Sequence, residues 1–158
     1  MTSDLCIRPA TAADADAIVS VLAAAFLEFQ PLYTPEGFRA TTPDVAGVLA
    51  RMSEGPSWVV LDGSRVVGTA AAIDRGNEIY LRGMAVLPSA QGGGVATKLL
   101  AVVTQFAVDQ GASLLTLSTT PFLESAIRLY EQHGFAASDH RLDLFGTPLI
   151  RMVKRLSP

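Results

Sequence analysis

Three consecutive glycines, in the run Gln91-Gly92-Gly93-Gly94-Val95-Ala96, are the residues whose types and spacing point most directly to chemistry. They lie between an extended apolar run and a long amphipathic one. Glycine removes side-chain bulk from a turn, so backbone N–H groups can converge on an anion where a helix begins. The unpaired N–H groups of that helix start add about half a positive charge. The run therefore predicts a cradle for a diphosphate, and a glycine-rich surface turn is the alternative.

Two common phosphate-binding motifs do not fit this turn. A P-loop requires G-x-x-x-x-G-K-[ST], but counting from Gly92 places Thr97-Lys98-Leu99 where Gly-Lys-Ser/Thr is needed. A dinucleotide fingerprint could begin at Gly92 and Gly94, but Thr97 occupies the place of its third glycine. The strand expected at 114–118 also lacks the acid that would bind a ribose hydroxyl.

The elements that position the turn follow from hydrophobic periodicity and capping signals. Strands are expected at 5–8, 57–61, 65–73, 78–86 and 114–118, with two more in the tail 135–156. Helices are expected at 12–29, 43–52, 93–110 and 122–133, and the segment 30–42, with its prolines and aromatics, is expected to be irregular. This order predicts one α+β domain, residues 1–158, with a mixed, mostly antiparallel sheet and one parallel junction.

Composition narrows the class of protein. The 158 residues are 49% hydrophobic, which is enough for a sizeable core, and the net charge of −3 without a basic stripe argues against a nucleic-acid partner. No apolar run approaches a membrane span and no secretory signal is seen, so no membrane association and a cytoplasmic location are expected. No Cys/His/Asp spacing indicates a metal site. Seven acids against three arginines give residues 1–60 a net charge of −4, which is typical of a solvated acidic face and otherwise favours a cationic substrate over an acidic one.

Two motifs resemble those of the GCN5-related N-acetyltransferase (GNAT) family. The run from Gln91 to Ala96 resembles its Q/R-x-x-G-x-G/A acetyl-CoA motif, and it follows a strand ending Met84-Ala85-Val86. The segment 126–135 resembles its A-I-x-L-Y-E-x-x-G-F signature. The motifs stand in the family's order, and the resemblance covers Leu5 to about Leu156. It implies a sheet that splays open at the parallel junction, with helices on both faces.

The resemblance also implies a reaction, the transfer of an acetyl group from acetyl-CoA to a primary amine of a small molecule or peptide. The pyrophosphate would lie on the backbone amides of residues 91–96, where Thr97 is either a hydroxyl ligand or an ordinary helix residue. The pantetheine arm would pair with the backbone of Met84, Ala85 and Val86. A non-catalytic acyl-CoA-binding sensor or regulatory module is the alternative.

The expected catalytic groups are an acid and a base. Tyr130 matches the family's tyrosine and would protonate the departing thiolate, although spacing alone is typical of a core aromatic. The family's glutamate position falls on Tyr80, and Glu78, two residues earlier on the same strand face, is the candidate base through water or else a surface charge. Glu28 and Glu36 are further candidates for the base.

The acceptor site is expected in the front segment of the chain. Tyr33, Glu36 and Phe38 there are expected to form an aromatic and acidic pocket for a cation. Leu123 occupies the position where the family often has an asparagine that contacts the cofactor, which puts that side-chain contact in doubt. The apolar tail from Leu142 to Leu156 is a candidate surface for a homodimer.

Overall fold

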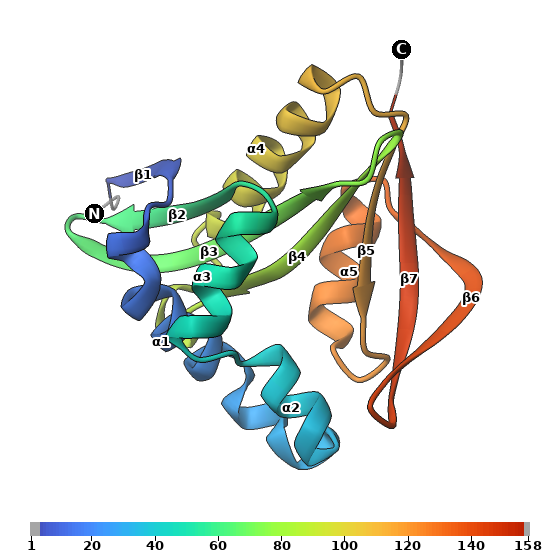
Figure 1. Cartoon of the computed structure of the whole chain (residues 1–158), viewed down its shortest axis with the longest axis horizontal. Coiled ribbons are helices and arrows are strands. Elements are labelled where there is room, and N and C mark those ends of the chain that lie inside the picture. The colour runs from blue at the N-terminus through green and yellow to red at the C-terminus, as the bar shows by residue number, and fades with distance from the viewer. Residues whose placement is uncertain (1–3, 157–158) are drawn as a thin grey trace.

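The computed structural model describes residues 4–156, in which one seven-stranded sheet carries helices on both faces (Figure 1). The strands are β1 (Leu5–Pro9), β2 (Ser57–Asp62), β3 (Arg65–Asp74), β4 (Glu78–Val86), β5 (Leu114–Thr119), β6 (Ala136–Leu144) and β7 (Thr147–Arg155). The helices are α1 (Ala15–Phe26), α2 (Pro35–Thr41), α3 (Val45–Glu54), α4 (Val95–Asp109) and α5 (Glu124–Gln132). None of these helices is both long and apolar enough to cross a bilayer.

The sheet contains one parallel pair of strands, and this pair separates soon after it forms. The strand order is β1-β2-β3-β4-β5-β7-β6, and β4 pairs with β5 in parallel over only three residue pairs, which end at Tyr80 and Thr116. All the other neighbouring strands of the described sheet pair antiparallel. Beyond Tyr80 the two strands diverge into a V-shaped opening (Figure 1). The predicted mixed sheet with a splayed parallel junction is confirmed.

A bulge in β4 lies beside this opening. Arg82 pairs with Ala71 and Ala85 pairs with Thr69, so two residues of β4 stand opposite one residue of β3. Gly83, inside the bulge, has a φ of +63°, a left-handed conformation that glycine adopts without a Cβ clash. The bulge therefore changes the direction of β4 where its pairing with β5 has already ended.

The hydrophobic core lies between the sheet and its helices. Leu22 of α1 and Leu99 of α4 are almost fully buried from opposite faces of the strands β2–β4. Gly68 allows α4 to approach the sheet closely, since a Cβ there would lie 2.5 Å from a methyl carbon of Val95. The same packing fixes the start of α4, and with it the glycine turn.

The segment 30–42 is not irregular, so that prediction is wrong. A 3-10 helix (Leu27–Leu32) extends α1, and α2 follows it directly. Thr34 caps α2, because its Oγ1 accepts a hydrogen bond from the Gly37 amide at 3.0 Å, and Pro35 occupies the first helical position. A proline at that position starts a helix rather than breaking one.

Most of the apolar tail does not offer a free strand to a second subunit, although its residues 142–144 form the end of the edge strand β6. Strand β7 is internal, because it pairs with β5 on one side and with β6 on the other. The edges of the described sheet are β1 and β6. A homodimer stays a prediction, and it cannot form through the backbone of β7.

An ion pair anchors the start of the first helix. Arg8 Nη1 donates to Asp14 Oδ2 at 2.8 Å, and the Thr11 amide donates to the same oxygen at 2.8 Å. The Asp14 side chain is only 10% exposed. The hydrogen bond from Arg8, followed by the bond from the Thr11 amide, lowers the pKa of Asp14 from 3.8 to about 2 against the opposing effect of burial.

Replacing this carboxylate is expected to cost stability only where it is ionised. Asp14→Asn should lower the free energy of unfolding by about 1–2 kcal/mol near neutral pH. A lowered native pKa stabilises above the unfolded value of 3.8, so the difference should shrink as the pH falls from 3.8 towards about 2. Urea unfolding of both proteins at several pH values measures this difference in the free energy of unfolding. Asp16→Asn, at an exposed position of α1, is the control, and a difference that persists unchanged at the lowest pH contradicts this account.

Candidate active site

The glycine turn forms the start of α4 as predicted. Gly92 and Gly94 have φ values of +82° and +86°, and Gly94 is the N-cap of the helix. A Cβ at either position would meet nothing within 4 Å, and residues 91–94 are exposed. The Lys98 amide bonds the Gly94 carbonyl at 3.0 Å, and the helix amides that precede it have no intrahelical acceptor. The turn thus presents free donors around open space, which suits an anion.

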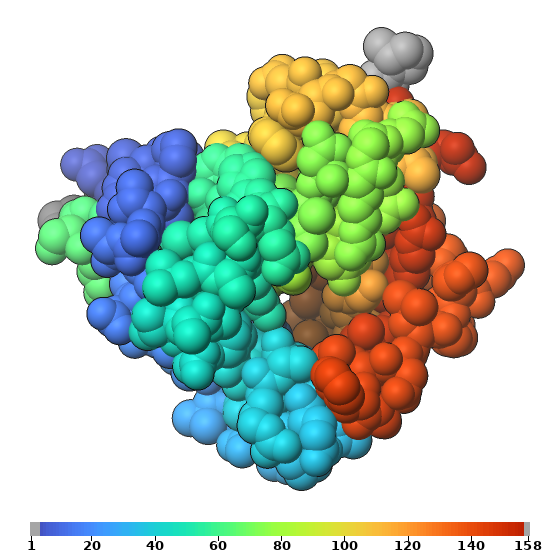
Figure 2. Space-filling view, in the orientation of Figure 1, coloured from blue at the N-terminus to red at the C-terminus, as the bar shows by residue number. Residues whose placement is uncertain are grey.

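A cavity of about 220 Å³ lies at the splay between β4 and β5. Its wall includes residues 80–84 of β4, residues 117–120 at the end of β5, Leu123, Ala126 and Tyr130 beside or on α5, Phe26, Tyr33, Ala40, Thr41 and Arg51 from the front helices, and Leu144 and Leu149 of the β6–β7 hairpin. Because α5 lies behind the sheet and α2 and α3 lie in front of it, the cavity crosses the plane of the sheet (Figure 1). Figure 2 shows its front as a hollow between α3, α2 and the β6–β7 hairpin.

Tyr130 lies in the wall of this cavity. The residue is 7% exposed, and its ring packs edge-on against Phe135 at 5.7 Å between centroids. Burial raises the pKa of Tyr130 above its ordinary value of 10.0, and no hydrogen bond from the described residues offsets that effect. The phenol is therefore protonated at neutral pH and can donate a proton into the cavity.

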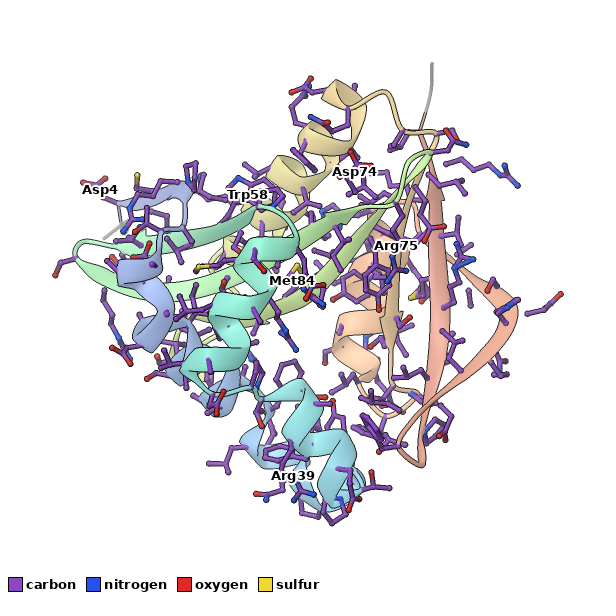
Figure 3. The ribbon with its side chains drawn as sticks, viewed as in Figure 1. Asp4, Arg39, Trp58, Asp74, Arg75 and Met84 are labelled. Atoms are coloured by element: carbon purple, nitrogen blue, oxygen red, sulfur yellow. The ribbon has the colours of Figure 1, made fainter. Side chains whose placement is uncertain are left out.

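Glu78 lies at the closed end of the splay and is not part of the cavity wall. Its carboxylate accepts hydrogen bonds from Thr116 Oγ1 at 2.6 Å and from Arg151 Nη2 at 2.7 Å. Arg75, which also lies 3.9 Å from this carboxylate, stacks over the Tyr80 ring at 4.2 Å (Figure 3). Glu78 thus ties β4 to β5 and β7, and Tyr80 and Arg82, further along the same strand face, line the cavity.

The front segment contributes less of the expected acceptor pocket than its composition indicated. Tyr33 lines the cavity and packs edge-on against Phe122 at 4.9 Å and against Phe38 at 5.8 Å. Phe38 and Glu36 are not in the wall. Glu36 is 58% exposed and pairs with Arg39 at 3.4 Å, and Arg39 lies on the outer part of α2 in Figure 3. Tyr33 and Tyr130 therefore line the same cavity, and Glu36 lies outside its wall. Glu28 is exposed and also lies outside the wall.

Two arginines that the sequence reasoning missed stand in the cavity wall. Arg51 of α3 donates to the Ala40 carbonyl at 2.9 Å, and Arg82 of β4 contacts Glu54 at 3.3 Å. Burial, together with the nearby charge of Arg82, lowers the pKa of Arg51. No acidic residue of the described range lines the cavity. The front of the cavity is therefore cationic, the opposite of the expected charge.

A pair of hydrogen bonds ties α2 to the β6–β7 hairpin across the front of the cavity. The Thr34 amide donates to Thr147 Oγ1 at 2.9 Å, and Thr34 Oγ1 donates to the Phe145 carbonyl at 2.8 Å. Thr147 is almost fully buried, at 1% exposure. Helix α2 therefore joins the two halves of the sheet that the splay separates.

Residues 19–135 match the model of the acetyltransferase (GNAT) family, a range that holds the glycine turn, the splayed strands and Tyr130. The chain belongs to the GNAT family. This membership confirms the resemblance on which the sequence analysis relied.

Individual relatives of this GNAT protein align over part of their length. N-acetyltransferase family 8 member 2 from Rattus norvegicus is 34% identical over 94 residues, which are 56% of this chain and 42% of that protein. N-acetylaspartate synthetase from Homo sapiens is 42% identical over 89 residues, 52% of this chain and 29% of that protein. The chain thus spans less than half the length of these curated relatives.

A solved structure matches the whole fold. PaiA N-acetyltransferase from Thermoplasma acidophilum, solved in complex with coenzyme A, superposes with a TM-score of 0.79. The match covers 97% of this chain and 99% of that one, at 15% identity. The splayed sheet with helices on both faces is therefore the GNAT fold.

Removing the cap of α2 is expected to loosen both sides of the cavity. Thr34→Ala deletes the cap and the tie to the hairpin, so α2 and the β6–β7 hairpin should both exchange amide hydrogens faster, with a cost of about 1–2 kcal/mol in local stability. Asp44→Ala is the matched control, because Asp44 caps α3 through the Gly47 amide at 2.9 Å and should affect that helix alone. Hydrogen exchange resolved by segment measures both, and unchanged exchange in the hairpin of Thr34→Ala contradicts the tie.

Proposed function

We propose that this GNAT protein transfers the acetyl group of acetyl-CoA to a primary amine, on a small molecule or a peptide, by direct attack of the amine. The observation that carries the proposal is the cavity at the splay, which crosses the sheet beside Tyr130 and the free edge of β4. One sheet and one hydrophobic core run through residues 4–156, which supports a single acetyltransferase domain. The curated relatives named above are an N-acetyltransferase and an N-acetylaspartate synthetase, which agrees with an amine acceptor.

The residues at the turn and along β4 fit coenzyme A. The backbone amides of Gln91 to Ala96 would hold the pyrophosphate. Residues 91–94 are exposed, and the open space at Gly92 and Gly94 leaves room for it. Thr97, exposed in the first turn of α4, would add a hydroxyl. The backbone of Met84, Ala85 and Val86, which β5 does not pair, would bond the amides of the pantetheine arm, and Figure 3 places Met84 beside the opening. Bound acetyl-CoA supplies the acetyl group as an activated thioester.

In this proposal only one side chain of the described residues, Tyr130, takes part in proton transfer. Tyr130 would donate its phenolic proton to the sulfur as the amine nitrogen bonds the acetyl carbon and the carbon–sulfur bond breaks, and Tyr130 would then regain a proton from water. The amine gives its own proton to water, because no carboxylate of the described range lines the cavity. The positive charges of Arg51 and Arg82 favour the neutral, nucleophilic form of the amine. Glu78 keeps its ion pair with Arg151 throughout.

A change at the cradle is expected to weaken cofactor binding specifically. Gly94→Ala should raise the Kd for coenzyme A by about tenfold or more, since it disturbs amides that would bind the pyrophosphate. Gly111→Ala, at the far end of α4, is the matched control, because Gly111 has a similar φ of +75° and a Cβ there also meets nothing within 4 Å. Both variants should lose a similar amount of stability. Isothermal titration with coenzyme A measures the Kd, and equal losses of affinity in the two variants would contradict the cradle.

Removing the phenolic proton donor is expected to reduce turnover without reducing binding. Tyr130→Phe should lower kcat by about 100-fold and leave the Kd for coenzyme A unchanged. Tyr33→Phe makes the same chemical change elsewhere in the cavity wall and should alter KM for the amine rather than kcat. Thiol release in the presence of a panel of amines measures turnover. Cofactor binding without turnover for any amine would favour a non-catalytic acyl-CoA sensor instead.

A further inference from the structure

Arg82, which belongs to the cavity wall, carries a buried guanidinium edge without a hydrogen-bond partner among the described residues. Its Nε and Nη2 atoms are buried and have no hydrogen-bond partner among residues 4–156, whereas its Nη1 contacts Glu54 Oε2 at 3.3 Å. Nε and Nη2 carry the two parallel N–H groups on one side of the guanidinium, and this fork matches the two oxygens of a carboxylate. Buried donors without acceptors are costly, so the edge calls for a ligand.

Arg51 stands on the same side of the cavity and is placed by the β4 bulge. A Cβ at Gly83 would lie 2.8 Å from Arg51 Nη1, so the guanidinium occupies space that a larger residue would take. Its Nη2 is anchored to the Ala40 carbonyl at 2.9 Å. Burial lowers the pKa of Arg51, and the nearby charge of Arg82 lowers it further, whereas the charge of Glu54 acts in the opposite direction. The two guanidiniums therefore lie close together, and Glu54, which pairs with Arg82, lies outside the cavity wall.

We propose that the acetyl acceptor is a small amine that also carries a carboxylate, of the α-amino acid class, and that the Nε–Nη2 edge of Arg82, supported by Arg51, binds this carboxylate. The inference rests on the proposed function and narrows its substrate class. Two guanidiniums and no acid line a cavity of about 220 Å³, a volume that suits a single zwitterionic molecule better than a polypeptide. The carboxylate end would lie on the α3 side, which directs the amine towards the splay and Tyr130.

The test compares acceptors that differ only in the anionic group. Acetyl transfer from acetyl-CoA is followed by thiol release with L-amino acids, with the matching L-amino acid amides, with a neutral primary amine, and with phosphoethanolamine. The amide of an amino acid has the lower amine pKa and is intrinsically the readier nucleophile at neutral pH. A preference of about 100-fold in kcat/KM for the acid over the amide is nevertheless expected, because the amide leaves the buried fork unpaired.

Variants connect this preference to the fork. Arg82→Gln should raise KM for the preferred amino acid by about 10- to 100-fold and remove the preference over the amide, with an unchanged Kd for coenzyme A. Arg82→Lys keeps the charge and loses the fork, so it should restore only part of the affinity. Arg39→Gln removes one positive charge at a side chain that is 70% exposed and outside the cavity wall, and it should leave the preference intact.

The possible outcomes separate the substrate class from the reaction. Acetylation of amides or of the neutral amine as efficiently as of amino acids overturns the carboxylate site and leaves the acetyltransferase intact. A preference for phosphoethanolamine over every amino acid likewise overturns the assignment to a carboxylate. Bound cofactor with no acetylation of any amine overturns the proposed function and the acceptor assignment together. Because the acid and amide are compared on the unmodified protein, a variant that fails to fold does not affect this result.

Discussion

The whole site depends on one interruption of backbone pairing, the point after Tyr80 where β4 loses β5 as a partner. Backbone N–H and C=O groups that leave a sheet must find other partners, so residues 81–86 form an edge that an extended, amide-bearing ligand can complete. The same divergence opens the cavity across the sheet and brings helices of both faces into one wall. The glycine turn lies directly beyond this edge, so phosphates bound there would place the rest of a linear cofactor along β4.

The opening is held at both ends by specific contacts. At the closed end, Glu78 joins β4 to Thr116 of β5 and to Arg151 of β7, so the divergence begins at a fixed residue. At the open end, the bonds of Thr34 to Thr147 and Phe145 tie α2 to the β6–β7 hairpin. A splay without these ties would let its two halves move independently. The Glu78 carboxylate is thus better explained by the geometry of the sheet than by proton transfer.

Sequence reasoning found the parts of the site that depend on local pattern. The glycine turn, the strand before it and Tyr130 belong to short motifs whose spacing is set by one strand or one helix, and the structure places them as predicted. Helix α2 does not follow from the sequence pattern, because a segment with several prolines usually indicates a loop, whereas Pro35 occupies the first position of this helix. The position of Arg82 near the cavity could have been predicted from the sequence, because alternation along the strand places it on the same face as Tyr80. No sequence pattern predicts the position of Arg51, because it depends on the packing of α3 against a bulge that forms only in the folded sheet.

The cavity wall contains a candidate proton donor and two arginines but no carboxylate, so in this proposal the protein donates a proton and the substrate supplies the negative charge that orients it. Burial raises the pKa of Tyr130, so the phenol is protonated at neutral pH and would be available as a donor there. Arg51, Arg82 and Glu54 together carry one net positive charge, which a bound substrate carboxylate would balance. The substrate's carboxylate would therefore fix its orientation, and the amine would lose its proton to water rather than to a group of the cavity wall. In this proposal Tyr80 can stand where an acidic residue was expected, because no protein carboxylate takes the proton of the amine.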